Sequence, residues 1–280
     1  MTKTELNRMM QGLSRFARGL LVVACILVAV AMAAPAGVTQ SADQLTPIQR
    51  EIERQRQRLS SSDIEERRDA LMRLGNLKRP DASRVASASL NDAAVQVRVA
   101  AAHAVVFLPP AEAAGLLLPL LQDRAEFIRR EAAYALGETH SRTAVGRLSE
   151  LLSGDKETAV RGAAAVALGQ IGDETAVNAL SQALSGMKKK KKAAPADEFL
   201  MRSAAHSLGQ IRSRAGLPAL IAALSDDQNP LDVRREAAAA LGLIGDPAAA
   251  PSLRAVLDSS DPYLAEAARE ALRRLAMARN

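Results

Sequence analysis

Aromatic residues are scarce in this chain of 280 residues: they make up 2% of it, and tryptophan is absent. Hydrophobic residues nevertheless make up 48%, so the apolar content comes almost entirely from small and aliphatic side chains. Tightly stacked helices with cores of Ala, Val and Leu are typical of such a composition. A linear stack of this kind also has no need of one large core, because each unit buries surface only against its neighbours.

Residues that carry catalysis or bind metal are also few. Cys25 is the only cysteine, which excludes an internal disulfide, and the three histidines are His103, His140 and His206. No His-x-x-x-His pair, cysteine cluster or glycine-rich phosphate loop occurs. The sequence therefore predicts no catalytic residue, no metal and no cofactor, and we expect a protein that is not an enzyme.

The positive charge is concentrated in one place. Lys and Arg number 37 against 31 Asp and Glu, and five of the lysines are consecutive. They are Lys188, Lys189, Lys190, Lys191 and Lys192. Because nucleic-acid binding needs a basic stripe across a face, we expect no specific nucleic-acid partner. The run predicts a solvated loop over residues 185–197, with contact to an acidic partner or to anionic headgroups as the alternative.

A long hydrophobic run is found only at Leu20–Ala34, behind a basic segment and before the small residues Ala34-Pro35-Ala36. This is the layout of a secretory signal, so residues 1–36 are predicted to be removed and the protein exported to the periplasm or cell envelope. The alternative is an anchor retained in the inner membrane, although 15 residues fall short of the ~20 that span a bilayer. Lipoprotein processing before Cys25 is a third, weaker interpretation.

The rest of the chain repeats. Leu168 and Leu184 are 16 residues apart, and the same spacing recurs in six copies. The other pairs are Leu74 and Leu90, Val105 and Leu121, Leu136 and Leu152, Leu208 and Leu224, and Leu241 and Leu257. From each second residue to the next first one the distance is 15 to 17, except for 24 between Leu184 and Leu208. The constant half predicts a rigid helical hairpin and the variable half a loop.

Helix and turn signals lie at fixed places in each copy. Gly172-Asp173 and Gly245-Asp246 are interpreted as turns in which aspartate is the N-cap of the second helix. A further glycine follows the first repeated leucine, where we interpret it as a left-handed C-cap. These glycines are Gly137, Gly169, Gly209 and Gly242.

The best-preserved copies, Val160–Leu184 and Val233–Leu257, read Val-Arg-x-x-Ala-Ala-x-Ala-Leu-Gly-x-Ile-Gly-Asp. This pattern resembles the HEAT repeat family, in particular the short repeats of phycobilin lyase subunits, over about residues 62–280. The resemblance implies an all-α, right-handed α-solenoid of stacked antiparallel helical hairpins. Residues 37–61 are then a linker and N-terminal capping helix, and residues 261–279 the C-terminal capping helix. No histidine precedes Glu, so the His-Glu pairs of the HEAT-repeat hydroxylases are absent.

In the family the Val-Arg helix lines the concave face, so the resemblance implies a row of partner-binding side chains there. Counting that valine as zero, position 6 and the neighbouring positions 2 and 3 point away from the stack. The predicted site residues are His103, Tyr134, Val166 and His206, with Arg130 and Arg235 beside them. The alternative is that this row only packs against the adjacent helix.

From the resemblance and the predicted row we expect a protein–protein interaction scaffold. A membrane-anchored scaffold and a lyase-like or chaperone-like subunit are the alternatives.

The arginine of Val-Arg recurs as well. Arg98 and Arg129 each follow an aspartate by six residues, which suits a structural pairing with the turn or with an adjacent repeat. Binding of an anionic partner is the alternative.

Overall fold

The computed structural model describes residues 45–185 and 195–277, and of residues 195–197 the backbone only. The chain divides into two compact units, Met1–Arg50 and Glu51–Asn280, and the second contains all the helical hairpins. The predicted leader and the lysine run lie outside the described residues, so both stay predictions. Within the part that is described, no helix is long and apolar enough to cross a membrane.

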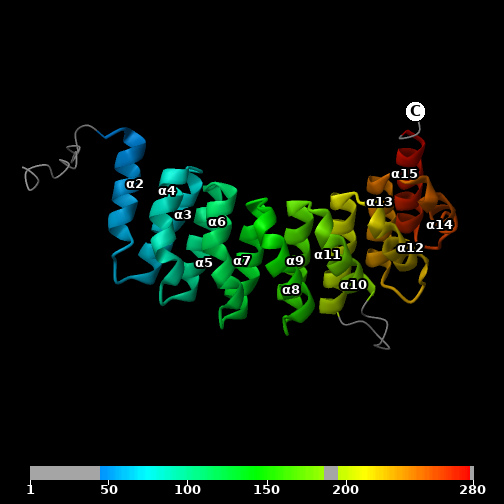
Figure 1. The fold of residues 1–280 in the computed structure, drawn as a ribbon, viewed down its shortest axis with the longest axis horizontal. Coiled ribbons are helices and arrows are strands. Elements are labelled where there is room, and N and C mark those ends of the chain that lie inside the picture. The colour runs from blue at the N-terminus through cyan, green and yellow to red at the C-terminus, as the bar shows by residue number, and fades with distance from the viewer. Residues whose placement is uncertain (1–44, 186–194, 278–280) are drawn as a thin grey trace, which may run out of the picture. The chain divides into compact units, whose positions relative to one another are not determined.

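Every regular element described in the second unit is a helix, and the helices alternate between two layers (Figure 1). The first layer holds the Val-Arg helices: α3 (Ile64–Asn76), α5 (Val95–Ala104), α7 (Glu126–Glu138), α9 (Thr158–Ile171), α11 (Pro195–Ile211), α13 (Leu231–Ile244) and α15 (Pro262–Met277). The second layer holds α4 (Pro80–Ser87), α6 (Pro110–Leu117), α8 (Val145–Gly154), α10 (Val177–Ser185), α12 (Leu217–Ser225) and α14 (Ala250–Arg254), and α2 (Pro47–Arg58) precedes them all. Consecutive first-layer helices pack on each other, and α9, α11, α13 and α15 also pack on the second-layer helix that precedes each of them in the chain. The predicted all-α solenoid of stacked hairpins is confirmed.

Short 3₁₀ helices complete the hairpins. They are η2 (Ala88–Asn91), η3 (Val105–Phe107), η4 (Leu118–Gln122), η5 (Arg142–Ala144), η6 (Glu174–Ala176), η7 (Arg214–Gly216) and η8 (Pro247–Ala249). Asp173 accepts a hydrogen bond from the Thr175 amide, and Asp246 accepts one from the Ala248 amide. Both aspartates therefore cap the second helix, as predicted.

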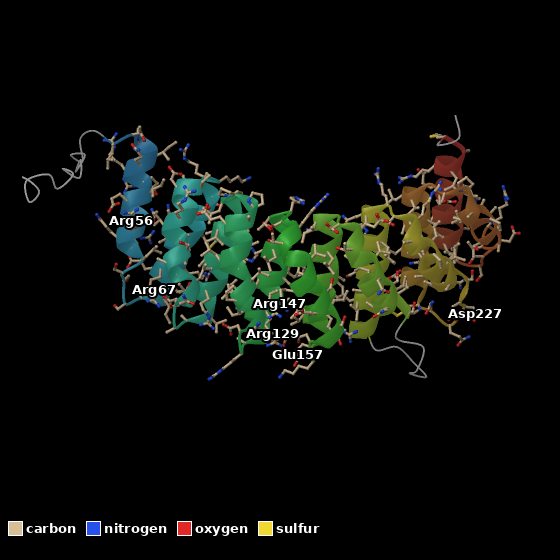
Figure 2. The ribbon with its side chains drawn as sticks, in the orientation of Figure 1. Arg56, Arg67, Arg129, Arg147, Glu157 and Asp227 are labelled. Atoms are coloured by element: carbon tan, nitrogen blue, oxygen red, sulfur yellow. The ribbon has the colours of Figure 1, made fainter. Side chains whose placement is uncertain are left out.

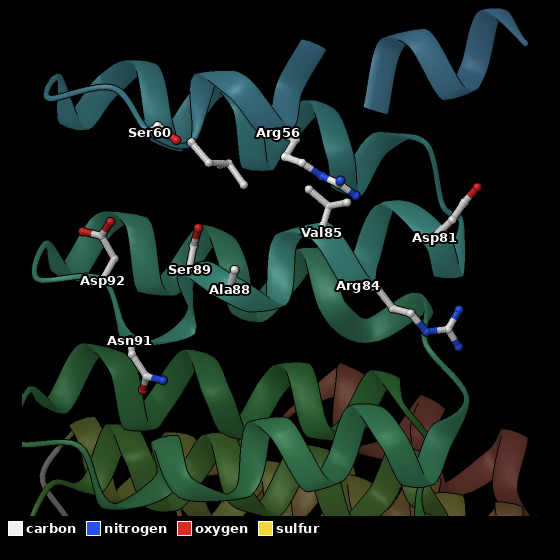
Figure 3. Close-up of a pocket in the computed structure, with 10 residues that line it drawn as sticks. Arg56, Ser60, Asp81, Arg84, Val85, Ala88, Ser89, Asn91 and Asp92 are labelled. Atoms are coloured by element: carbon white, nitrogen blue, oxygen red, sulfur yellow. The ribbon is translucent and has the colours of Figure 1, made fainter. Parts of the chain in front are cut away.

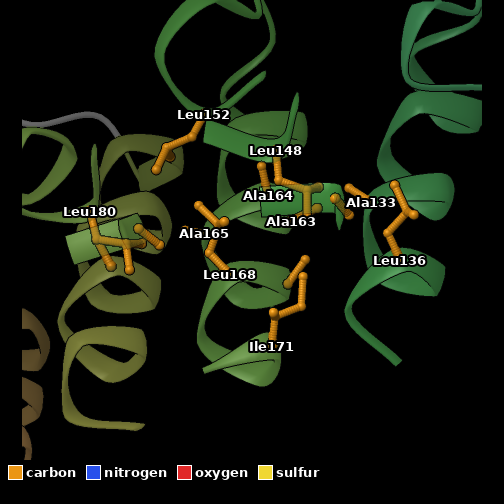
Figure 4. Close-up of a cluster of buried hydrophobic side chains, with 14 of the residues drawn as sticks. Ala133, Leu136, Leu148, Leu152, Ala163, Ala164, Ala165, Leu168, Ile171 and Leu180 are labelled. Atoms are coloured by element: carbon orange, nitrogen blue, oxygen red, sulfur yellow. The ribbon is translucent and has the colours of Figure 1, made fainter. Parts of the chain in front are cut away.

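The repeated leucines form the spine of the core. Leu136, Leu168 and Leu241 have no exposed surface, and Leu208 is almost as fully enclosed. Figure 4 shows Leu136 and Leu168 pointing into the apolar interior between neighbouring helices, with Leu180 in the same cluster. Because a single hairpin cannot cover these side chains on both sides, the stack is held together by repeat-to-repeat burial.

The glycines that follow the leucines do not end the helices, so their assignment as left-handed caps is wrong. Gly169 and Gly242 lie inside α9 and α13, and the left-handed residue comes three positions later. Among the described residues, φ is positive at Lys78, His140, Gly172, Arg212 and Gly245. A methyl group built on Gly242 would lie 2.7 Å from Cα of Ala271, and one on Gly209 would lie 2.8 Å from Cα of Ala240. These glycines permit first-layer helices to approach each other closely.

We expect Gly242→Ala and Gly115→Ala to have opposite effects on stability. The added methyl group at Gly242 meets the backbone of α15, and overpacking of this kind typically costs ~1–3 kcal/mol. Gly115 lies inside α6 with nothing within 4 Å of the added carbon, so alanine should stabilise by ~0.5–1 kcal/mol through helix propensity alone. Urea unfolding of both variants measures this, and a stabilised Gly242→Ala would contradict the close-approach assignment.

Arginine–aspartate pairs link consecutive repeats. Arg129 donates from Nε to Asp155 at 2.6 Å and from Nη2 at 3.0 Å, while its Nη1 donates to the carbonyl oxygen of Asp123 in the preceding loop. Arg67 binds Asp92 in the same way, and Figure 2 places Arg67 and Arg129 along one edge of the array. The structural interpretation of this arginine is therefore confirmed. Arg67 and Arg129 bind the acid of the next repeat and the backbone of their own turn, whereas Arg161 and Arg234 donate to the carbonyl oxygens of Leu152 and Leu224.

Candidate functional site

A cavity of about 380 Å³ opens on the first layer between α3 and α5. Its apolar lining comes from Leu71, Met72, Gly75, Val99, Ala100, Ala104 and Phe107. Its polar lining comes from Arg68, Asn76, Lys78, Gln96 and His103. The volume falls at the lower end of the range for binding pockets, and binding pockets generally combine an apolar wall with a few polar groups.

The cavity lies where α5 gives way to a 3₁₀ turn. The other first-layer helices continue beyond the repeated leucine, whereas α5 ends at Ala104 and tightens into η3. Pro109 and Pro110 follow soon after, and proline excludes a continued helix by removing a donor and restricting the residue before it. The last turn is therefore a 3₁₀ turn, and its Phe107 lines the cavity together with Gly75 and Asn76 of α3.

The predicted row at position 6 lies at the surface of the first layer. His103 lines the cavity beside Met72, its equivalent in α3, which is 53% exposed. Tyr134 and Val166 are half-buried on α7 and α9, and His206 is exposed on α11. The row is thus accessible at its two histidines and is partly covered at its centre.

Acidic residues already approach both histidines. His103 Nε2 lies 3.2 Å from Glu131 Oε2, and His206 Nδ1 lies 2.8 Å from Glu236 Oε1. Each contact joins one first-layer helix to the next. Burial raises the pKa of the Tyr134 phenol, so this side chain is neutral at physiological pH.

The two predicted arginines have partners within the array. Arg130 donates to Glu131 at 3.0 Å and lies over the Phe127 ring, 4.9 Å from its centre. Arg235 binds Asp261 at 2.7 Å and Asp232 at 2.6 Å, and it lies 5.1 Å from the centre of the Tyr263 ring. Cation–π stacking of this kind holds the guanidinium flat on the surface.

Sequence reasoning missed several of these surface residues. Phe127 and Tyr263 both stand one position before the start of the Val-Arg pattern, a periodicity that is present in the sequence. Val99, Phe107 and Lys78 were missed because they belong to copies whose motif is degraded. The signal that could have found them is Val105-Val106-Phe107 followed after one residue by two prolines, which marks a shortened helix.

A second, larger cavity of about 730 Å³ lies between α2 and α4 (Figure 3). Its lining carries charges of both signs, with Arg84 and Asp81 at one end and Asp92 at the other. Arg84 is paired with Glu112 at 3.1 Å and Asp92 with Arg67 at 2.8 Å. Arg84 and Asp92 thus already form ion pairs within the protein. The smaller cavity is therefore the better candidate for binding.

No group of three or more His, Cys, Asp or Glu side chains that could hold a metal ion is found among residues 45–185 and 198–277. His103 and His206 are held apart on separate helices, each beside a glutamate of the next first-layer helix.

Comparison with known proteins identifies the repeat. A family model described as HEAT repeats matches residues 52–137, 116–196 and 192–273. A segment of 82 residues is 42% identical to deoxyhypusine hydroxylase from Gallus gallus, which is 29% of this chain and 27% of that protein. The chain therefore matches about a quarter of the length of this curated relative.

Two solved structures share the fold. The CpcE–CpcF complex of phycocyanin lyase from Nostoc sp. PCC7120 aligns with a TM-score of 0.50 and 24% identity, over 85% of this chain and 97% of that one. YibA from Escherichia coli aligns with a TM-score of 0.55 and 18% identity, over 81% and 82%. At these identities the likeness concerns the fold alone.

The hydroxylase match overturns one expectation. The absence of catalytic motifs predicts a protein that is not an enzyme, but the segment that is 42% identical belongs to an enzyme. The physical reason is that the repeat pattern records helix packing. The same pattern therefore occurs in arrays that only bind and in arrays that catalyse.

Proposed function

This chain belongs to the HEAT repeat family, and on that premise we propose that its first-layer helices line the concave side of the solenoid and bind a protein partner. The cavity between α3 and α5 is the principal contact. The observation that carries the proposal is an open, mostly apolar cavity on the face that holds the position-6 row.

Close spacing of the first layer supports its assignment to the concave side. α9 contacts α11 far more extensively than α8 contacts α10, and the same holds for α11 with α13 against α10 with α12. Glycines 137, 209 and 242 allow this approach, whereas nothing lies within 4 Å of a carbon added to Gly115 or Gly146 in the second layer. A stack that is shorter along one layer curves toward that layer.

Exposure of the cavity wall supports its use in binding. A large apolar side chain such as Met72 is half-exposed here although neighbouring Leu71 is completely buried. Methionine adapts its shape readily and is common at protein-binding surfaces. Hot spots of interfaces are likewise well-packed pockets that exclude water once filled.

Site-specific photo-crosslinking in cells of the source organism tests this proposal. A photoreactive amino acid at Met72 should yield one predominant crosslinked protein, and the same substitution at Arg147, an exposed residue of α8, should not. Equal crosslinking from both positions, or crosslinking from Arg147 alone, would contradict binding by the first layer.

We further propose that the protein is exported and that residues 1–36 are removed. The support is the order of basic segment, apolar run and small residues in the sequence. The intact mass of the native protein should correspond to a chain that starts at Gly37. A mass that includes Met1–Ala36 would favour the membrane-anchored alternative.

Catalysis is a second candidate, favoured by the segment that is 42% identical to deoxyhypusine hydroxylase. Hydroxylation of deoxyhypusine by the purified chain would support it, and a lack of turnover would remove this reaction.

A further inference from the structure

The rim of the α3–α5 cavity is basic. Arg68, Lys78 and His103 contribute to its lining, and no Asp or Glu does. Two of these groups face an acid nearby: Arg68 donates to Glu65 at 2.7 Å, and His103 lies beside Glu131. Lys78 is exposed and forms no ion pair within residues 45–185 and 198–277. The ammonium of Lys78 is therefore the uncompensated charge at the cavity.

The backbone of Lys78 is left-handed. Its φ is 51°, a conformation that disfavours side chains with a Cβ. The same structural position is glycine in the best-preserved copies, Gly172 and Gly245, where φ is 73° and 74°, and in two other copies it is His140 and Arg212, where φ is 51° and 57°. Local stability therefore favours glycine at residue 78. A lysine there gives the fold no ion pair, whereas it does give the cavity a cation.

We propose that the occupant of this cavity is an acidic segment of the partner protein, which inserts one bulky apolar side chain and places a carboxylate on Lys78. This inference rests on the proposed function and specifies its partner. Leu71, Met72 and Phe107 supply the apolar wall for the inserted side chain. The basic rim selects the charge of the residues that flank it, because complementary potentials set specificity and speed association.

Fluorescence anisotropy with two labelled octapeptides tests the charge preference. Both carry Leu-Phe at the centre; one has three acidic residues on each side, and the other has glutamine in their place. We expect the acidic peptide to bind about tenfold more tightly at low salt and to lose most of that advantage near 0.5 M salt.

Three variants locate the binding. Lys78→Gln should weaken the affinity for the acidic peptide about three- to tenfold and leave the affinity for the glutamine peptide unchanged. Arg212→Gln is the matched control, since Arg212 is also an exposed cation with positive φ but lies outside the cavity, and it should have no effect. Ala100→Trp, which fills the cavity, should abolish binding of both peptides. Melting temperatures establish that each variant is folded, and Lys78→Gln alters only an exposed side chain.

The outcomes separate this inference from the proposed function. If both peptides bind with equal affinity and both lose binding in Ala100→Trp, the proposal of an acidic occupant is overturned. Binding of a partner at the cavity would remain supported. Displacement of the acidic peptide by dodecanoate but not by an excess of unlabelled acidic peptide would overturn it in favour of a free acyl chain. Unchanged binding in Lys78→Gln would also overturn it.

Discussion

Replacing Leu168 by alanine is expected to lower the free energy of unfolding by ~2–5 kcal/mol, the range for a leucine deleted from a closed core. Leu168 has no exposed surface and lies where α9 meets its neighbours in the core cluster. Neighbouring repeats pack against it from both sides, so the cavity left behind can collapse only in part.

Urea unfolding followed by circular dichroism measures this effect. The matched control is Leu231→Ala in α13, where the leucine is 46% exposed and the change should stay within about 0.5 kcal/mol. Equal effects at the two leucines would contradict the assignment of Leu168 to the spine of the core.

Asp155→Asn is expected to destabilise by ~1.5–3 kcal/mol, as for a hydrogen bond to a charged group whose partner stays buried. The side chains of Arg129 and Asp155 are only 10% and 6% exposed, and two hydrogen bonds join them. The amide keeps the shape but removes the charge that neutralises the Arg129 guanidinium. Glu150→Gln, which breaks the exposed pair with Arg147, is the control and should cost under about 1 kcal/mol.

The pH dependence of the same variant gives a second readout. Burial acts to raise the pKa of the Asp155 carboxyl, but the hydrogen bonds from Arg129 and from the Glu157 amide outweigh it, and the pKa is lowered. A lowered pKa in the folded state adds stability above the unfolded pKa of about 3.9, and this stability is lost as the pH falls through the folded pKa. The difference between parent and Asp155→Asn should therefore be largest at neutral pH and should shrink in acid. A difference that grows below about pH 4 would contradict the pairing.

The repeat could be predicted because it depends on local sequence. A hairpin has a fixed length, so the 16-residue spacing from Leu168 to Leu184 identified it, and burial of those leucines followed from helical periodicity. The role of Gly242 could not be assigned in this way. A helix end and a close approach between helices both favour glycine after leucine, and only the position of Ala271, 29 residues later, distinguishes them.

The site was predicted only in part. The resemblance placed His103 on a first-layer helix, but the cavity that His103 lines lies where α5 changes into the 3₁₀ turn η3, and no sequence pattern indicated that change. The walls of the cavity come from two repeats, so it forms only because α3 packs against α5. The basic rim also depends on Lys78, which the repeat pattern did not single out because the best-preserved copies have glycine at that position.

Binding of the partner at the α3–α5 cavity is the central claim to be tested. The most direct measurement uses the partner protein that is captured by crosslinking through Met72. Its affinity is measured for the parent chain, for Ala100→Trp and for Gln182→Trp. Gln182→Trp is the control, because it places tryptophan on an exposed site of α10. We predict that Ala100→Trp weakens binding at least about 30-fold, as expected for the loss of a hot spot of about 2 kcal/mol or more, with Gln182→Trp equal to the parent. Undiminished affinity of a folded Ala100→Trp variant would contradict the account.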